Sequence, residues 1–254
     1  MSRLRLAVVG LGMALAPHAR ALAELADLYD VVGAYAPSPA RRQAAARDFG
    51  LPVTDDLDRL IENVDVGLIL TPPATHSELA LRFFAAGRHV LLEKPLETDL
   101  ERAKGLVAAA ARHGRALGVV LQHRFREASL ALEDLVTSGA LGPLAVASCR
   151  VPWWRPQSYY DEPGRGTRAR DGGGVLLTQA IHTLDLFRAV SGGVARVAAV
   201  ARTTQLHRME CEDYVAATLE LANGAVGWLE ASTATYPGHP EEIRLVGTRG
   251  VATL

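Results

Sequence analysis

Cysteine is nearly absent from this sequence of 254 residues. Cys149 and Cys211 stand far apart, which excludes a disulfide framework and a cysteine-based metal site. No apolar run reaches the ~18 residues of a membrane-spanning helix. Met1 to Arg3 lead directly into a predicted strand rather than a signal peptide. We therefore expect a cytoplasmic protein with no bound metal and no membrane partner.

An excess of charge of either sign is also lacking, since 27 basic residues face 28 acidic ones. A nearly neutral chain does not present the basic surface that nucleic acid requires, so we expect no nucleic-acid partner. Of the basic residues only Lys94 and Lys104 are lysines. A lysine in a chain that otherwise uses arginine suggests a need for a compact, titratable ammonium group.

Strands and helices alternate through the first half of the chain. Strands are predicted at residues 4–9, 29–36, 64–70, 90–92 and 116–121, and helices at 14–26, 39–48, 55–63, 75–86 and 98–113. This alternation predicts an α/β fold with a doubly wound parallel sheet, a Rossmann dinucleotide-binding domain at residues 1–122. The length of 254 residues suits one large or two modest domains, and 49% hydrophobic residues are typical of a globular protein.

The pattern changes at His123. Helices are predicted at 129–138 and 175–190, and strands at 144–151, 194–205, 214–221, 225–233 and 241–246. Hairpin signals such as Asn223-Gly224 join several of these strands. We predict an α+β domain with a mainly antiparallel open sheet at residues 123–254.

Two glycines, Gly10 and Gly12, directly follow the first predicted strand and open a helix. Gly10 permits a tight turn, and Gly12 lets a pyrophosphate approach the helix N-terminus. We predict that this turn, with Met13, binds a dinucleotide. Leu15 replaces the third glycine of the fingerprint, so an ordinary strand–helix turn is the alternative.

The end of the second predicted strand lacks the acidic residue that usually holds the ribose 2′-hydroxyl of NAD. Ser38 stands nearby, and Arg41 and Arg42 follow. These residues favour NADP over NAD as the cofactor, although arginines at the start of a helix are often merely solvated.

Polar side chains follow two predicted strands that end in proline-containing loops. Val90 to Leu92 end at Glu93-Lys94-Pro95, where proline stops the strand. The carboxyl ends of parallel strands are where open α/β sheets bind ligands. We predict that Glu93, Lys94 and the residues Thr71, Pro72 and His76 of the preceding loop lie beside the cofactor. A surface lysine, and a histidine that merely starts a helix, are the alternatives.

A second group of polar residues lies in the predicted helix 175–190. Thr178, His182 and Asp185 are spaced four and three residues apart, so they share one helical face. An imidazole, whose unperturbed pKa is ~6.5, suits general acid/base catalysis near neutral pH. The alternative is a core histidine bonded to Asp185.

An aromatic loop precedes this helix. Trp154, Arg155 and Tyr160 fit a sugar-binding wall, although aromatic residues at such positions also form core. We include these three residues in the predicted substrate site, together with Arg124.

Taken together, these motifs resemble the Gfo/Idh/MocA oxidoreductases, which include glucose–fructose oxidoreductase and inositol 2-dehydrogenase. The resemblance implies an NAD(P)-dependent dehydrogenase that transfers hydride between a sugar-like or polyol hydroxyl and a nicotinamide. It also implies that Lys94 contacts the reacting hydroxyl, that His182 transfers its proton, and that the Lys94–Pro95 bond is cis. A homodimer or homotetramer through the C-terminal sheet is expected.

The chain departs from this family in two respects. Thr178 stands where many members carry aspartate four residues before the histidine, so the acid/base role rests on His182. The chain is shorter than most members, so we expect the final strands of the sheet to be missing. The stretch from Tyr159 to His182 looks like members that act on nucleotide-linked amino sugars. A non-catalytic cofactor-binding regulator and a biliverdin-reductase-like or dihydrodiol-dehydrogenase-like reductase are the alternatives.

Overall fold

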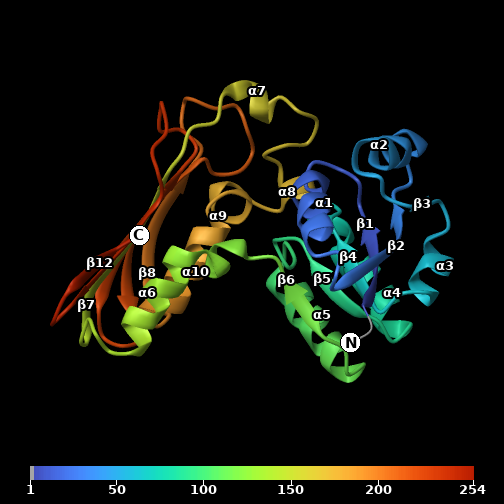
Figure 1. Cartoon of the computed structure of the whole chain (residues 1–254). Coiled ribbons are helices and arrows are strands. Elements are labelled where there is room, and N and C mark those ends of the chain that lie inside the picture. Colours follow the sequence, from blue (N-terminus) through green and yellow to red (C-terminus); the bar gives the residue numbers. More distant parts are fainter. Residues whose placement is uncertain (1–2) are drawn as a thin grey trace. The chain divides into compact units, whose positions relative to one another are not determined.

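The computed structural model describes residues 3–254, and the chain divides into two compact units, residues 1–120 and 121–254 (Figure 1). The division falls between Val120 and Leu121, two residues before the predicted boundary. The first unit is an α/β structure and the second is an α+β structure.

The described part of the first unit contains one parallel sheet of six strands in the order β3-β2-β1-β4-β5-β6. The strands are β1 (Leu4–Val9), β2 (Tyr29–Tyr35), β3 (Val53–Thr54), β4 (Val66–Ile69), β5 (His89–Leu92) and β6 (Leu117–Val119). The helices are α1 (Leu15–Glu24), α2 (Pro39–Phe49), α3 (Leu57–Glu62), α4 (His76–Ala85) and α5 (Leu100–Arg112), with the 3₁₀ turn η1 (Pro73–Thr75). This is the predicted Rossmann topology, and the two-residue strand β3 is an addition to the prediction.

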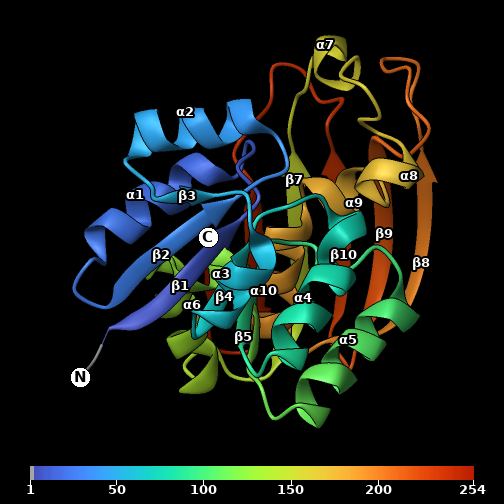
Figure 2. The ribbon, with the colours of Figure 1, turned by 90° about the vertical axis from the view of Figure 1, so that its right-hand side faces the viewer.

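Helices cover both faces of this sheet because its strands are apolar on both sides. Along β1, Leu6 and Val8 join the core under α1 and α2, whereas Ala7 and Val9 join the core under α3, α4 and α5. Figure 2 shows α1 and α2 on one face and α4 and α5 on the other. The strand ends are thereby held in place by two separate cores.

Side-chain caps fix where several of these helices begin. Ser38 accepts a hydrogen bond from the Arg41 backbone N–H, and Asp56 caps α3 in the same way. The predicted helix 98–113 begins at Leu100 instead, because Asp99 rather than Thr98 caps α5 and accepts a hydrogen bond from the Arg102 backbone N–H. Both residue types can cap a helix, so the sequence alone did not separate them.

The second unit has a six-stranded sheet within its described residues, in the order β12-β11-β7-β10-β9-β8. The strands are β7 (Leu144–Pro152), β8 (Val194–Arg202), β9 (Tyr214–Leu221), β10 (Val226–Ser232), β11 (Glu242–Gly247) and β12 (Val251–Thr253). The helices are α6 (Glu127–Thr137), α7 (Gln157–Tyr160), α8 (Arg168–Asp171), α9 (Val175–Thr178) and α10 (Ile181–Ser191), with the 3₁₀ turn η2 (Gln122–Phe125). Strands β7 and β10 pair in parallel and the other described pairs are antiparallel, as expected for a mainly antiparallel sheet.

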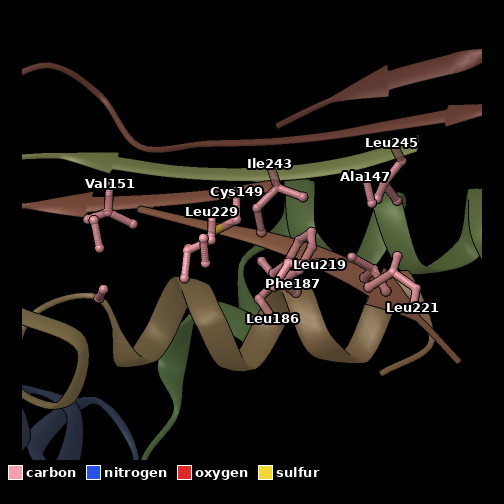
Figure 3. Close-up of a cluster of buried hydrophobic side chains, with 14 of the residues drawn as sticks. Ala147, Cys149, Val151, Leu186, Phe187, Leu219, Leu221, Leu229, Ile243 and Leu245 are labelled. Carbon is pink, nitrogen blue, oxygen red and sulfur yellow. The ribbon is translucent and has the colours of Figure 1, made fainter. Parts of the chain in front are cut away.

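One face of this sheet packs on α10, where Leu186 and Phe187 meet Cys149, Leu219 and Ile243 (Figure 3). These side chains are buried, and burial raises the pKa of the Cys149 thiol to about 12. Cys149 therefore stays neutral and acts as a core residue.

The predicted continuous helix from residue 175 to 190 is broken. Helix α9 ends at Thr178 and α10 begins at Ile181, with Gln179 at φ −114° between them. His182 and Asp185 therefore lie on one helix at a spacing of three, but Thr178 is not on that helix. The assumption that all three share one face is wrong.

Candidate active site

The glycine turn lies between β1 and α1, and its shape fits a dinucleotide pyrophosphate. Gly10 has φ +103°, and a Cβ there would lie 2.7 Å from the Thr71 backbone nitrogen. A Cβ on Gly12 would have no neighbour closer than 4.0 Å, so the backbone is open to an incoming group. The N-cap residue of α1 is Ala14, which has no side chain able to cap the helix. Leu15 N–H donates to the Gly12 carbonyl oxygen at 3.1 Å and Pro17 has no N–H, so the Ala16 N–H is the group of this first turn that can donate to a phosphate oxygen.

Met13 and Leu15, two other residues near this turn, differ in their exposure. Met13 lies in the turn with 72% of its surface exposed. Leu15, at the position of the missing third glycine, is buried in the core under α1. The turn therefore keeps Gly10, whose positive φ and close contacts exclude a side chain, and Gly12, beside which the backbone is open.

Ser38, Arg41 and Arg42, the residues predicted to select NADP, make different contacts in the structure. Ser38 caps α2, and Arg42 donates from Nη1 to the carbonyl oxygens of Ala36 and Pro37, at 2.7 and 3.0 Å. The Arg42 guanidinium is thus committed to the loop after β2. Arg41 lies on the side of Gly12, with Nη1 4.0 Å from the position that a Gly12 Cβ would take. Of the two arginines, Arg41 is placed beside the glycine turn.

The loop after β4 is held by its own side chains. The Thr75 hydroxyl lies 2.7 Å from that of Thr71 and 2.9 Å from the Pro72 carbonyl oxygen. His76 is fully buried, with Nδ1 3.0 Å from the Pro95 carbonyl oxygen and Nε2 2.8 Å from the Thr71 carbonyl oxygen. His76 therefore ties the loop after β4 to the loop after β5, and both of its ring nitrogens contact backbone carbonyl oxygens.

The loop after β5 carries Glu93 and Lys94, and the Lys94–Pro95 bond is cis, as the resemblance implied. The Glu93 carboxylate accepts from the Lys94 backbone N–H at 3.0 Å, and its other oxygen lies 2.6 Å from His18 Nε2. Because β1, β4 and β5 are neighbours in a parallel sheet, Lys94 lies at the same edge as the glycine turn.

A buried carboxylate, Glu97, fixes the rest of this loop. It accepts from the Ser77 backbone N–H at 3.1 Å and from Arg102 Nη2 at 3.0 Å. Burial acts to raise the Glu97 pKa, but the hydrogen bonds from Arg102 and Ser77 outweigh it and hold the pKa below its usual range. Glu97 therefore remains ionised at neutral pH and anchors the starts of α4 and α5.

In the second unit, His182 lies in the first turn of α10 and is 8% exposed. Asp185, one turn later, accepts from Arg124 Nε and, at 2.6 Å, from Arg124 Nη2. Both Asp185 oxygens therefore face the Arg124 guanidinium. The same ion pair fixes Arg124, a predicted substrate ligand, whose side chain is still 41% exposed.

Beside His182 lies a second histidine that the sequence did not point to. The rings of His123 and His182 are 5.0 Å apart between centroids. Arg126 Nη2 lies 2.6 Å from His123 Nε2, and Glu241 lies 3.4 Å from Nδ1. Burial lowers the pKa of His123, Glu241 opposes that shift, and Arg126 adds to it. Because an arginine can only donate, His123 Nε2 accepts and its proton is on Nδ1, towards Glu241.

Thr178 and the aromatic loop are held by contacts within the second unit. The Thr178 hydroxyl donates to the Gly174 carbonyl oxygen at 2.7 Å. Trp154 packs edge-on against Tyr236, with 5.5 Å between ring centroids. Arg155 lies over Trp153 and Tyr159, at 5.4 and 5.6 Å from the two centroids.

Tyr160 differs from its neighbours because it is buried. Its hydroxyl lies 2.6 Å from the Thr233 hydroxyl, and burial is the main cause that raises its pKa to about 12. Tyr159 is partly exposed, and its hydroxyl accepts from Arg165 at 3.1 Å. Of the two tyrosines, Tyr159 has the more accessible ring, a distinction that adjacent identical residues cannot show in a sequence.

The described residues contain no helix long and apolar enough to cross a membrane. Across residues 3–254 no three histidine, cysteine, aspartate or glutamate side chains gather as a possible metal site.

Two family models match the two units. Residues 4–121 match a model described as the oxidoreductase family with an NAD-binding Rossmann fold. Residues 129–253 match one described as the GFO/IDH/MocA C-terminal domain.

Curated relatives match over most of the chain. Inositol 2-dehydrogenase of Rhizobium meliloti is 27% identical over 97% of this chain and 74% of its own length. D-glucoside 3-dehydrogenase of Escherichia coli is 30% identical over 92% of this chain and 71% of its own length. Both relatives are named as dehydrogenases.

Solved structures with the same fold contain bound NADH. The WlbA dehydrogenase of Bordetella pertussis, in complex with NADH and UDP-GlcNAcA, has a TM-score of 0.93 and 31% identity over 99% of this chain and 78% of that one. Levoglucosan dehydrogenase, in complex with NADH and levoglucosan, has a TM-score of 0.90 and 25% identity over 100% of this chain and 73% of that one.

Proposed function

This chain belongs to the Gfo/Idh/MocA family of NAD-binding oxidoreductases, and from that premise we propose that it oxidises or reduces a hydroxyl-bearing carbon of a sugar, sugar derivative or polyol. The observation that carries the proposal is Lys94 at the carboxyl end of β5, on a loop fixed by Glu93, Glu97 and His76. A lysine on a fixed loop at the ligand-binding edge of a Rossmann sheet suits a developing alkoxide.

We assign two residues to the chemistry. The bound nicotinamide supplies the hydride acceptor or donor. The Lys94 ammonium stabilises negative charge on the substrate oxygen, as a preorganised donor does in an oxyanion hole. The His182 imidazole takes the hydroxyl proton during oxidation and returns it during reduction. Thr178 can donate a hydrogen bond but cannot act as a base near neutral pH, so we assign it no proton transfer.

Arg155 and the Tyr159 ring support a nucleotide-linked sugar as the substrate class, whereas the nearly buried Arg165 pairs with Glu162. Arg165 lies 4.5 Å from the centre of the Tyr159 ring, and Arg155 contacts the same ring. Guanidinium groups recognise phosphate, and an aromatic ring can stack on a base or a sugar. The WlbA dehydrogenase, solved in complex with UDP-GlcNAcA, has this fold. We propose that the segment from Trp153 to Thr167, with Thr178, binds such a substrate.

The test is a fluorescence titration of the protein with NADH and NADPH, followed by an activity screen. The screen compares inositols, simple glucosides and nucleotide-linked amino sugars with each cofactor. Turnover of the last class supports the substrate assignment, and turnover of inositols alone removes it. Binding of a nicotinamide without turnover of any hydroxyl compound would point to a regulatory protein instead, and turnover of apolar substrates alone to the biliverdin-reductase-like alternative.

We propose that NADP is preferred over NAD, because no acidic side chain follows β2 and Arg41 lies beside the glycine turn. Ser38→Asp keeps the α2 cap, since aspartate caps as well as serine, but adds a negative charge. It should weaken NADPH binding about tenfold or more, because like charges repel, and leave NADH binding nearly unchanged. Arg41→Ala should also weaken NADPH binding more than NADH binding.

The matched control for this prediction is Arg47→Ala, which removes an arginine of the same helix that pairs with Asp48. Arg47→Ala should change neither the affinity for NADH nor the affinity for NADPH. Equal losses for NADH and NADPH in Ser38→Asp would contradict the assignment.

We propose that the outer face of the C-terminal sheet binds a second copy of this chain. Val200, Val226 and Trp228 are 54%, 56% and 42% exposed there. The nearby charges already pair across the strands, as Arg150 with Glu230 and Arg196 with Glu220. A second copy would therefore meet an apolar, neutral surface without repulsion between like charges.

Val200→Glu should weaken self-association at least about tenfold, because the dimer would bury an unpaired carboxylate. Sedimentation velocity across a concentration series measures the change. Val197→Glu changes an exposed residue of the same strand that faces the opposite way, and it should leave the association unchanged. A monomeric parent chain at all concentrations would refute the proposed dimer.

A further inference from the structure

A histidine of the cofactor-binding helix contacts the loop that carries Lys94. His18 lies at the end of the first turn of α1, and its Nε2 is 2.6 Å from Glu93 Oε1. Both side chains are largely shielded, with 17% and 16% of their surfaces exposed. The other Glu93 oxygen, Oε2, accepts from the Lys94 backbone N–H at 3.0 Å. The Glu93 carboxylate therefore joins α1 to the backbone of Lys94.

The direction of the His18 hydrogen bond follows from the charge of Glu93. Burial acts to raise the Glu93 pKa, but the hydrogen bond and charge of His18 together with the backbone hydrogen bond and charge of Lys94 outweigh it and hold the pKa below its usual range. Glu93 is thus ionised at neutral pH and can only accept hydrogen bonds. His18 Nε2 must carry the proton and donate it.

The remaining anchors of this loop act on its backbone. The Glu93 N–H donates to the Ile69 carbonyl oxygen at 2.9 Å, which continues the β4–β5 pairing. His76 Nδ1 lies 3.0 Å from the Pro95 carbonyl oxygen. These contacts fix the residues on either side of Lys94 without involving α1. Loss of the His18 contact would therefore release the Glu93 side chain while the loop keeps its place in the sheet.

We propose that His18 is a positioning residue for Lys94, which it fixes through Glu93 relative to the helix that carries the cofactor-binding turn. The proposal rests on the proposed function of Lys94. Helix α1, which begins at the glycine turn, receives the pyrophosphate. The contacts from His18 through Glu93 to the Lys94 backbone therefore fix the position of the Lys94 loop relative to this helix. Small misplacements of a catalytic group can cost about a hundredfold in rate.

The kinetic test compares His18→Leu with His18→Gln. Glutamine can place an amide N–H near the position of His18 Nε2, whereas leucine cannot donate. We expect His18→Leu to lower kcat on the order of tenfold to a hundredfold, and His18→Gln to recover most of that loss. The dissociation constant for the nicotinamide cofactor should stay nearly constant in both. Equal losses of kcat in the two variants would overturn the proposal, because the donated hydrogen bond would not matter.

A second measurement does not depend on turnover. Because this sequence has two lysines, a protein labelled with ¹³C-lysine gives two sets of side-chain NMR signals, and Lys104→Arg identifies those of Lys94. The Lys94 signals should move in His18→Leu and return towards their original position in His18→Gln. The Lys104 signals should not move. His113→Leu, which changes an exposed histidine of the same unit, is the control and should move neither.

The two measurements separate the two proposals. Unmoved Lys94 signals in His18→Leu would overturn the positioning role, whatever the activity. Moved signals together with full activity of Lys94→Ala would support the contact through Glu93 and would overturn the catalytic role of Lys94 instead.

Discussion

Lys94→Ala is expected to lower kcat by at least about a hundredfold, because removing one preorganised donor to a developing oxyanion typically costs that much or more. The cofactor dissociation constant should change little, since the glycine turn and the N-terminus of α1 do not depend on this side chain. A loss in kcat without a loss in cofactor affinity identifies an interaction made mainly in the transition state. Steady-state kinetics with the best substrate of the screen, together with NAD(P)H fluorescence titration, measure both quantities.

The chain provides a matched control for this variant. Lys104, the other lysine, is 61% exposed and pairs with Glu101 on the surface of α5. Lys104→Ala should leave kcat unchanged. Lys94→Arg keeps a positive charge but replaces the compact ammonium with a planar guanidinium, so we expect it to remain impaired. Unchanged turnover in Lys94→Ala would remove this residue from the mechanism.

His182→Ala is expected to cause a loss of similar size, about a hundredfold or more in kcat, as general-base catalysis typically contributes. In the proposed mechanism His182 accepts the hydroxyl proton, so we expect the rate of oxidation by the parent enzyme to fall at low pH, where an imidazole is protonated. This limb of the pH–rate profile should disappear in His182→Ala. The remaining rate should instead increase as hydroxide becomes more abundant.

The exposed His239 of the same unit is the control for this prediction. His239→Ala should keep both the rate and the pH profile of the parent. An unchanged low-pH limb in His182→Ala would transfer the base role elsewhere, and the neighbouring His123 would then be the first residue to test, because its ring lies 5.0 Å from that of His182.

The local pattern of the sequence determined the class of the first unit and most of its strands. The glycine turn after one short apolar strand and the lysine at the end of another can both be recognised, because each involves only residues that are close together in the chain. Strand pairing then follows from the βαβ rule, which leaves few possible topologies. The strand Tyr214–Leu221 was predicted with its observed bounds because turn residues flank an alternating run.

The tertiary structure alone decided the contacts that position the candidate catalytic groups. His18 and Glu93 are separated by 75 positions, and Arg124 and Asp185 by 61. No spacing rule connects residues at such distances. The interruption between Thr178 and Ile181 was also missed, since the helical period continues through Gln179. Sequence periodicity identifies residues suited to a site, whereas packing decides which of them meet, because hydrogen bonds between distant segments exist only after the core has brought those segments together.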